Sequence, residues 1–288
     1  MSNEPHRSLD GSPHAMTGPL EFEILHRCAS TSARLGRVKT PHGSFQTPVF
    51  MPVGTRASIK GVLPSLVEEA GSEIILNNAY HLMLRPGDEL IARRGGVHRF
   101  MRWDRPILTD SGGYQAYSMA DINDLDEDGV TFKSIIDGAR IHLSPERSIE
   151  VQNNLGADII MAFDDCPPAV DPATFNESRR RLAAQQAGPH KSGYDHARRL
   201  REAHERTVRW LERCIAAHRR PDDQALFGIV QGGTDLDLRQ ASVDAICGFD
   251  LPGFAIGGVA VGEGPELIEH VVSFTAPRLP ESKPRYLM

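Results

Sequence analysis

The stretch Pro106-Ile-Leu-Thr-Asp-Ser-Gly-Gly-Tyr-Gln115 joins a short apolar run to a carboxylate and two glycines. The apolar run is typical of the end of a buried strand, and the Ser-Gly-Gly sequence predicts a tight turn directly after it. A carboxylate at that point is held rigidly and faces open space, which is where the catalytic groups of an α/β barrel lie. The glycines allow the backbone to approach a ligand with its N–H groups pointing inward. A strand followed by an acidic turn with no catalytic role explains the decapeptide equally well. The catalytic interpretation is supported because the same pattern recurs further along the chain.

The same pattern, an apolar run that ends in polar or glycine residues, recurs along the chain. We predict strands over residues 48–53, 73–78, 106–110, 158–163, 225–230 and 253–260, and the start of a seventh over 285–288. Strands that alternate with helices give a parallel sheet. An open doubly wound sheet is the main alternative, but no Gly-x-Gly-x-x-Gly turn follows the first strand. The predicted fold class is therefore α/β, a (β/α)8 TIM barrel that is incomplete at its C-terminus, with about six to seven of its strands present.

Two regions precede and interrupt this alternation. Residues 1–20 contain little to bury and predict a disordered tail, which leaves a single barrel domain over 21–288. Short alternating runs up to residue 50 predict an N-terminal antiparallel β cap. Asp137-Gly138, flanked by alternating residues, predicts a hairpin within an insertion at 120–145.

A second insertion, over 167–224, is basic and helical in pattern, and Gly188-Pro189 predicts a division into two helices. Its arginines fit a solvated helix face or a contact with RNA phosphates, and the solvated face is favoured.

Composition excludes several classes of protein. The chain has 288 residues, of which 40% are hydrophobic and 24% charged, as in ordinary soluble proteins. It has no apolar run near the roughly 18 residues of a membrane span, and its N-terminus lacks the pattern of a signal peptide. The net charge of −6 argues against a surface coated for nucleic acid. Its four cysteines are far apart, which argues against a disulfide framework or a zinc knuckle. We expect a cytoplasmic protein.

The polar residues at the strand ends are a few carboxylates mixed with amides, and they suit a planar polar ligand better than a metal ion. A metal site in a barrel usually has histidines or several clustered carboxylates. The strand-end groups are Asn77, Asn78, Asp110, Asp164, Asp165, Gln231 and the backbone of Gly257-Gly258. His81 is the one histidine nearby, and a structural role is favoured for it. Guanine fits: a carboxylate accepts its two adjacent N–H donors, and an amide or backbone N–H donates to its oxygen. Tyr114 is placed to stack on the ring. Flavins, pterins and sugars use similar groups, so the residue types alone leave the ligand open.

Longer motifs are more specific, and together they resemble bacterial tRNA-guanine transglycosylase, of the queuine tRNA-ribosyltransferase family. They are Phe50-Met-Pro-Val-Gly-Thr55, Tyr80-His-Leu-Met-Leu-Arg-Pro-Gly87, Asp110-Ser-Gly-Gly-Tyr-Gln115, Ser144-Pro-Glu-Arg-Ser148, Met161-Ala-Phe-Asp164, Phe227-Gly-Ile-Val-Gln-Gly232 and Gly257-Gly-Val-Ala-Val-Gly262. The resemblance runs from about residue 21 to Met288, and residues 167–224 are its weakest part. It implies an enzyme that removes guanine from the wobble position of a tRNA anticodon loop and inserts the queuosine precursor preQ1.

The resemblance also implies roles for individual residues. Asp110 would be the catalytic acid/base. The substrate-binding residues would be Ser111, Gly112, Gly113, Tyr114, Asp164, Gln231, Gly258 and Met288, with Tyr114 and Met288 stacking on opposite faces of the base. Asn78, Gln115 and Cys166 would support them. Cys166 and Val261 match the bacterial pattern and favour preQ1 over the bulkier queuine.

The covalent aspartate nucleophile and the structural zinc ligands of the family lie beyond Met288, so no metal ligand or cofactor is assignable within this chain. The resemblance implies a homodimer when complete. We therefore expect an N-terminal portion of the enzyme that is inactive alone and that aggregates or melts without cooperativity, because its sheet edges and core are uncovered. Two other functions stay open: a non-catalytic partner subunit of the same family, and an unrelated barrel hydrolase or lyase that uses Asp110 and Asp164.

Overall fold

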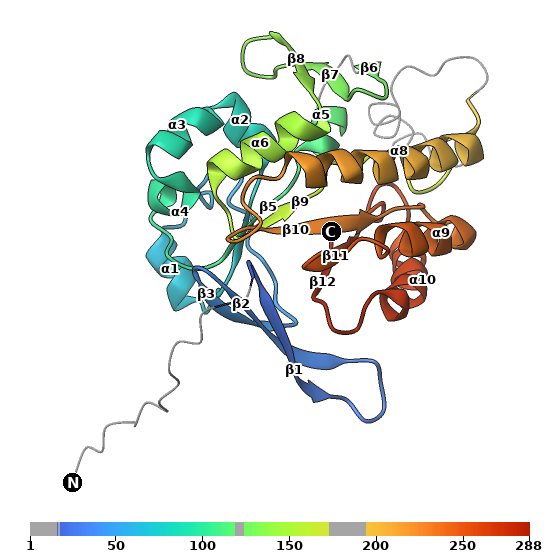
Figure 1. Ribbon diagram of the computed structural model, residues 1–288, viewed down its shortest axis with the longest axis horizontal. Helices are drawn as coiled ribbons and strands as arrows, with labels where there is room; N and C mark the ends of the chain where they lie inside the picture. The colour runs from blue at the N-terminus through green and yellow to red at the C-terminus, as the bar shows by residue number, and fades with distance from the viewer. Residues whose placement is uncertain (1–15, 17, 119–123, 173–193) are drawn as a thin grey trace.

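The computed structural model describes residues 16, 18–118, 124–172 and 194–288. Its body is a curled six-stranded parallel sheet with the strand order β12-β11-β10-β9-β5-β4 (Figure 1). These strands are β4 (Ile75–Asn77), β5 (Ile107–Thr109), β9 (Ile159–Met161), β10 (Ala225–Val230), β11 (Gly253–Ile256) and β12 (Arg285–Leu287). The sheet with its helices has the architecture of an incomplete TIM barrel and confirms the predicted fold class.

Helices cover the outer face of the sheet (Figure 1). They are α1 (Pro64–Glu69), α2 (Ala79–Leu84), α3 (Asp88–Arg93), α4 (Gly96–Met101), α5 (Gly113–Ser118), α6 (Pro145–Leu155), α8 (His196–Ala217), α9 (Leu236–Ile246), α10 (Pro265–Thr275) and the short 3-10 helix η2 (Ala276–Arg278). The start of α6 follows its sequence: Arg147 N–H donates to the Ser144 hydroxyl at 3.2 Å and Pro145 occupies the first turn. None of the described helices combines the length and apolar character that crossing a membrane requires.

The strands from β4 to β11 in this sheet bury both of their faces, whereas the edge strand β12 is only partly buried. Successive side chains alternate between the helix layer and the barrel interior. Ile160 and Leu226 pack outward with the helices, around Trp103 and Trp210. Ile159, Phe227 and their neighbours face inward, against a separate antiparallel sheet formed by β1 (Glu21–Arg27), β2 (Arg34–Thr40) and β3 (Gly43–Thr47). This sheet is the predicted N-terminal cap.

The strand predicted over 48–53 is much reduced. Only Val53 pairs, as an isolated parallel bridge to Leu76 at the edge of the sheet. Pro48 and Pro52 lack the N–H donors that a longer ladder needs, so the segment runs extended beside β4 without forming a strand.

Both predicted insertions have structure of their own. In the first, β6 (Asp124–Leu125), β7 (Val130–Lys133) and β8 (Arg140–Leu143) form an antiparallel sheet, with the predicted turn at Asp137-Gly138 between β7 and β8. In the second, α8 is the described helix. The predicted division at Gly188-Pro189 and most of the predicted tail lie outside the described residues.

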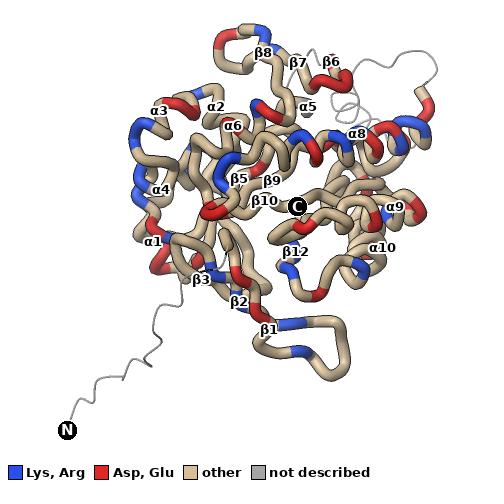
Figure 2. Tube along the Cα trace, in the orientation of Figure 1, with Lys and Arg blue, Asp and Glu red and all other residues tan. Residues whose placement is uncertain are grey.

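The arginines of α8 are mixed with acids along the helix (Figure 2), and several form ion pairs with other elements. Arg209 pairs with Glu127 at 2.7 Å and Arg213 with Glu146 at 2.6 Å. These ion pairs lie at the protein surface, so the solvated face that the sequence favoured is compatible with them, and they also link α8 to α6 and to the β6–β7 turn.

Candidate active site

The carboxyl ends of the parallel strands surround a cavity of about 260 Å³. All the predicted site residues except Gly112 and Gly113 line it: Asn78, Asp110, Ser111, Tyr114, Gln115, Asp164, Cys166, Gln231, Gly258 and Met288. Parallel pairing explains this meeting, since every strand delivers the residues that follow it to the same edge.

Gly112 and Gly113 form the turn beneath the site. Gly112 has φ +78°, and a Cβ atom there would lie 3.1 Å from the Tyr80 backbone nitrogen. A Cβ at Gly113 would lie 3.0 Å from the Phe163 ring. The pair therefore allows β5 to turn tightly into α5 against its neighbours.

Asp110 is buried and is held by three donors. The Ala79 backbone N–H donates to its Oδ1 at 2.8 Å, and the Gln115 side-chain amide donates to its Oδ2 at 2.9 Å. The Asn78 amide donates to the same Oδ2. Burial outweighs these donors and raises the pKa of Asp110 to about 6. A carboxyl group that titrates near neutral pH suits proton transfer in both directions.

The two acids after β9 face opposite ways. Asp164 lines the cavity and accepts a hydrogen bond from the Gln231 side-chain amide. Burial, and then the neighbouring charge of Asp165, raise the pKa of Asp164 to about 7 against the opposing effect of Gln231. Asp165 points instead to α8, where Arg199 donates to it at 2.8 Å and Arg206 pairs with it as well. Only the first acid of the pair is therefore available to a ligand.

Backbone groups form the opposite wall of the cavity. Gly258 has φ +62°, and a Cβ atom there would lie 2.3 Å from the Gln231 side-chain oxygen. The backbone of the following turn is fastened by the buried Glu263, which accepts a hydrogen bond from Val261 N–H at 3.0 Å and another from Ala260 N–H. Glycine at position 258 leaves this wall open to a flat ligand.

Tyr286 is a cavity residue that sequence reasoning missed. Burial and the nearby Asp110 charge raise its pKa to about 12, so its hydroxyl stays protonated. The period of two along extended chain could have found it, because Tyr286 lies in β12 two residues before Met288, and both line the cavity.

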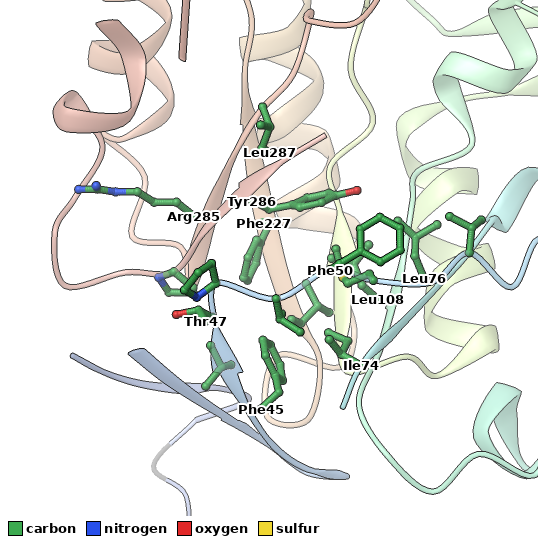
Figure 3. A pocket seen from close by; sticks show the side chains of 17 residues that line it. Phe45, Thr47, Phe50, Ile74, Leu76, Leu108, Phe227, Arg285, Tyr286 and Leu287 are labelled. Carbon is green, nitrogen blue, oxygen red and sulfur yellow. The ribbon is translucent and has the colours of Figure 1, made fainter. Parts of the chain in front are cut away.

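A second cavity, of about 420 Å³, lies between the sheet interior and the cap. Figure 3 shows Phe45, Phe227 and Tyr286 directed into it, with Arg285 pointing away. Its lining is mainly aliphatic and aromatic, and Tyr286, Leu76 and Val53 border both cavities. The polar strand-end cavity is therefore the site suited to a hydrogen-bonding ligand.

Among the described residues, one cluster has the composition of a metal site: His42, His98 and Asp158. The two imidazole rings stack at 3.6 Å with 13° between their planes. A metal bonded to ring nitrogens lies near the plane of each ring, and two parallel planes at that separation cannot share one ion. Each ring instead contacts its own Asp158 oxygen, at 2.8 and 2.9 Å, so the residues suit a buried hydrogen-bond network better than a zinc ion. His81 does not line the strand-end cavity; it packs edge-on against Tyr80.

Comparison with known proteins decides the family. The family model described as Queuine tRNA-ribosyltransferase matches residues 28–187 and 188–288. The chain belongs to the queuine tRNA-ribosyltransferase family. It is 50% identical over 269 residues to the queuine tRNA-ribosyltransferase of Acetivibrio thermocellus, covering 93% of this chain and 66% of the relative. It is 48% identical over 273 residues to that of Geobacillus kaustophilus, covering 95% and 66%. The chain thus spans slightly less than two thirds of the length of these relatives.

The raised pKa of Asp110 can be tested through the pH dependence of the stability of the folded protein. The folded-state pKa of Asp110, about 6, exceeds its ordinary value of 3.8, so between these pH values the folded protein binds more protons than the unfolded one. The contribution of Asp110 to stability therefore falls as pH rises through this window. We expect Asp110→Asn to gain stability relative to wild type between pH 4 and pH 7, by on the order of 2–3 kcal/mol.

Urea unfolding at pH 4, 5.5 and 7 of wild type and variant isolated from the protein's own cells measures this difference. The exposed Asp222 provides the matched control, since Asp222→Asn should show no comparable trend. A stability difference between Asp110→Asn and wild type that stays constant across the three pH values would contradict the raised pKa.

Proposed function

We propose that the protein is a tRNA-guanine transglycosylase that replaces guanine at the wobble position of a tRNA anticodon with preQ1. The observation that carries the proposal is the hydrogen-bonding pattern of the strand-end cavity. Asp164 is an acceptor for the two N–H donors on the guanine edge, while Gln231 and the Gly258 backbone are donors for its oxygen. Adenine presents the reverse pattern at these atoms and leaves Asp164 without donors.

The cavity suits a base that has left its stack. Tyr114 comes from α5 and Met288 follows β12, so the two side chains approach the cavity from elements far apart in the sheet order. They supply flat or polarisable surfaces for the two faces of a purine. The cavity has a volume of about 260 Å³ and lies at the ends of the strands. A nucleobase can enter it only after extrusion from the anticodon loop.

Asp110 supplies the proton chemistry. When the glycosidic bond breaks, its electron pair passes to the ring nitrogen of guanine, and protonated Asp110 donates a proton to the departing base. The resulting carboxylate then takes the proton from preQ1 as this base attacks the ribose. A pKa near 6 allows both steps without a large energetic penalty.

The covalent intermediate needs a separate nucleophile. Asp110 and Asp164 both hold other roles in the cavity, so we assign the glycosyl–aspartate bond to an aspartate outside these 288 residues, as the family resemblance implies. Such an intermediate divides the exchange into two displacements at the same carbon atom. The structural zinc expected of the family is likewise assigned outside this chain.

Cys166 and Val261 favour preQ1 as the incoming base. Both line the cavity beside Gly258, and both are small enough to leave room for the aminomethyl group of preQ1. We propose a cytoplasmic location, because the proposed tRNA substrate is found there.

Exposed apolar residues support a homodimer. Leu63 is 67% exposed and Leu66 48% exposed, next to one another at the start of α1. Burial of such a patch stabilises association. Sedimentation equilibrium should give a dimer mass for wild type and a monomer mass for Leu63→Asp, and a wild-type monomer would contradict the proposal.

Exchange activity tests the proposed function directly. Protein isolated from its own cells should incorporate radiolabelled guanine into tRNA, and Asp110→Asn should lower the rate by about 10²–10⁴-fold through loss of the acid/base group. Asp222→Asn is the control and should match wild type. Wild-type protein that binds guanine without exchanging it would instead favour the non-catalytic partner subunit, and a wild-type rate in Asp110→Asn would remove Asp110 from the mechanism.

Guanine affinity should depend on the ionisation of Asp164. The free protein has a pKa of about 7 at this residue, and only the carboxylate accepts both guanine donors. Binding must therefore displace a proton below pH 7, and we expect the affinity to fall about tenfold for each unit of pH decrease there. Calorimetry between pH 5.5 and pH 8 measures this, and in Asp164→Asn both the affinity and its pH dependence should be lost. An affinity that is constant over this range in wild type would show that Asp164 does not bind the base as a carboxylate.

A further inference from the structure

Arg239 is a fully buried arginine directly behind the base-binding wall. It belongs to α9, and its side chain has a relative exposure of 0%. Its Nε donates to Gly233 O at 2.8 Å and its Nη1 to Val230 O at 3.1 Å. Nη1 also donates to Gly257 O at 2.6 Å, and Nη2 donates to Gly258 O at 2.9 Å. One guanidinium thus joins the turn after β10 to the turn after β11.

Burying a charged guanidinium group at this place is energetically unfavourable. Removing a guanidinium from water costs several kcal/mol, and the four acceptors above are backbone carbonyls without net charge. Burial lowers the pKa of Arg239 to about 10, which still leaves the group charged at neutral pH. The cation is therefore kept next to the turns that carry Gln231 and Gly258.

The peptide geometry connects this cation to the cavity. Both peptide bonds concerned are trans, and in a trans peptide the C=O and N–H groups point in opposite directions. The Gly257 carbonyl points to Arg239, so the N–H of Gly258 points away from it. Gly258 and Val259 both line the cavity, whereas Arg239 does not, so the side away from Arg239 is the side of the cavity. The Gly258 carbonyl is fixed in the same way, which directs the N–H of Val259 away from Arg239.

We propose that Arg239 is a positioning residue for base exchange: it directs the N–H groups of Gly258 and Val259 toward the exocyclic oxygen of guanine and polarises them. This inference rests on the proposed function. When the glycosidic bond breaks, the electron pair left on the base spreads to that oxygen until Asp110 delivers a proton. A cation bonded to the carbonyl of the same peptide strengthens its N–H as a donor, because hydrogen bonds in a chain polarise one another. The arrangement stabilises developing charge in the way that oxyanion holes do.

Ligand selectivity separates this role from a merely structural one. 6-Thioguanine keeps both N–H donors that Asp164 accepts, and replaces the exocyclic oxygen with sulfur, a weaker acceptor. Dissociation constants of guanine and 6-thioguanine should be measured by calorimetry for wild type, Arg239→Gln and Arg239→Lys. Val243→Ala is the matched control, because Val243 is buried in the same helix and packs in the helix-layer core.

We expect wild type to prefer guanine, Arg239→Gln to lose about tenfold or more of this preference, and Arg239→Lys to restore part of it. Val243→Ala should melt earlier with an unchanged preference. If both ligands weaken equally in Arg239→Gln, the role is structural and the proposal is overturned. If wild type binds neither ligand, the proposed function itself fails. Should both variants fail to fold, the wild-type crystal structure with guanine decides: an exocyclic oxygen within hydrogen-bond distance of both Gly258 N–H and Val259 N–H, with Arg239 still bonded to the two glycine carbonyls, supports the proposal, and an oxygen that contacts only Gly258 N–H or lies elsewhere overturns it.

Discussion

Parallel pairing of the six strands is the constraint on which the rest of this structure depends. All five strand–strand contacts of the sheet, from β4 to β12, are parallel, so the residues that follow each strand are delivered to the same edge. Asn78 and Met288 follow the two opposite edge strands of the sheet, β4 and β12, and still line one cavity for this reason. A one-residue shift in register would exchange the side chains that face the helix layer with those that face the barrel interior, so the packing of both layers holds the strand ends at their relative heights. The site is therefore a consequence of sheet topology.

The same edge concentrates groups that oppose folding. Asp110 and Asp164 are both buried, and both have a pKa above the ordinary range of a carboxyl group. Their charged forms are less favourable in the folded protein than in the unfolded chain, which is typical of residues kept for chemistry. The structural acids behave differently: Asp158 accepts from two histidines, and its pKa is lowered. Burial, hydrogen bonding and nearby charges thus divide buried aspartates into those with a raised pKa and those with a lowered one.

Backbone groups contribute as much to the proposed recognition as side chains do. Gly258 has a positive φ and would collide with Gln231 if it carried a Cβ atom, so the wall of the cavity is made of peptide. Peptide groups have no rotamers, and their direction is set by the backbone dihedral angles and by the groups that bind their other side. The buried guanidinium of Arg239 on one side and the Glu263 carboxylate on the other hold the Gly257–Gly262 turn between opposite charges. A turn that is rich in glycine and therefore adaptable is made rigid by its charged neighbours.

The strand–helix alternation, the polar residues at strand ends and the family motifs could all be read from the sequence, because they depend on local patterns and on residue identity. The sequence therefore predicted the barrel class, the cap, the Asp137-Gly138 turn and most of the polar lining of the cavity. It did not show that Asp165 turns away to the α8 arginines, that Gly112 and Gly113 serve the turn rather than the cavity wall, or that the segment at Val53 barely pairs. Nor did it reveal Tyr286 or Arg239, since an arginine in a helix pattern looks solvent-exposed until its neighbours are known. These features depend on contacts between elements that are distant in the chain. Such contacts set the direction of a side chain and the energy of burying its charge, so they become visible in the three-dimensional structure.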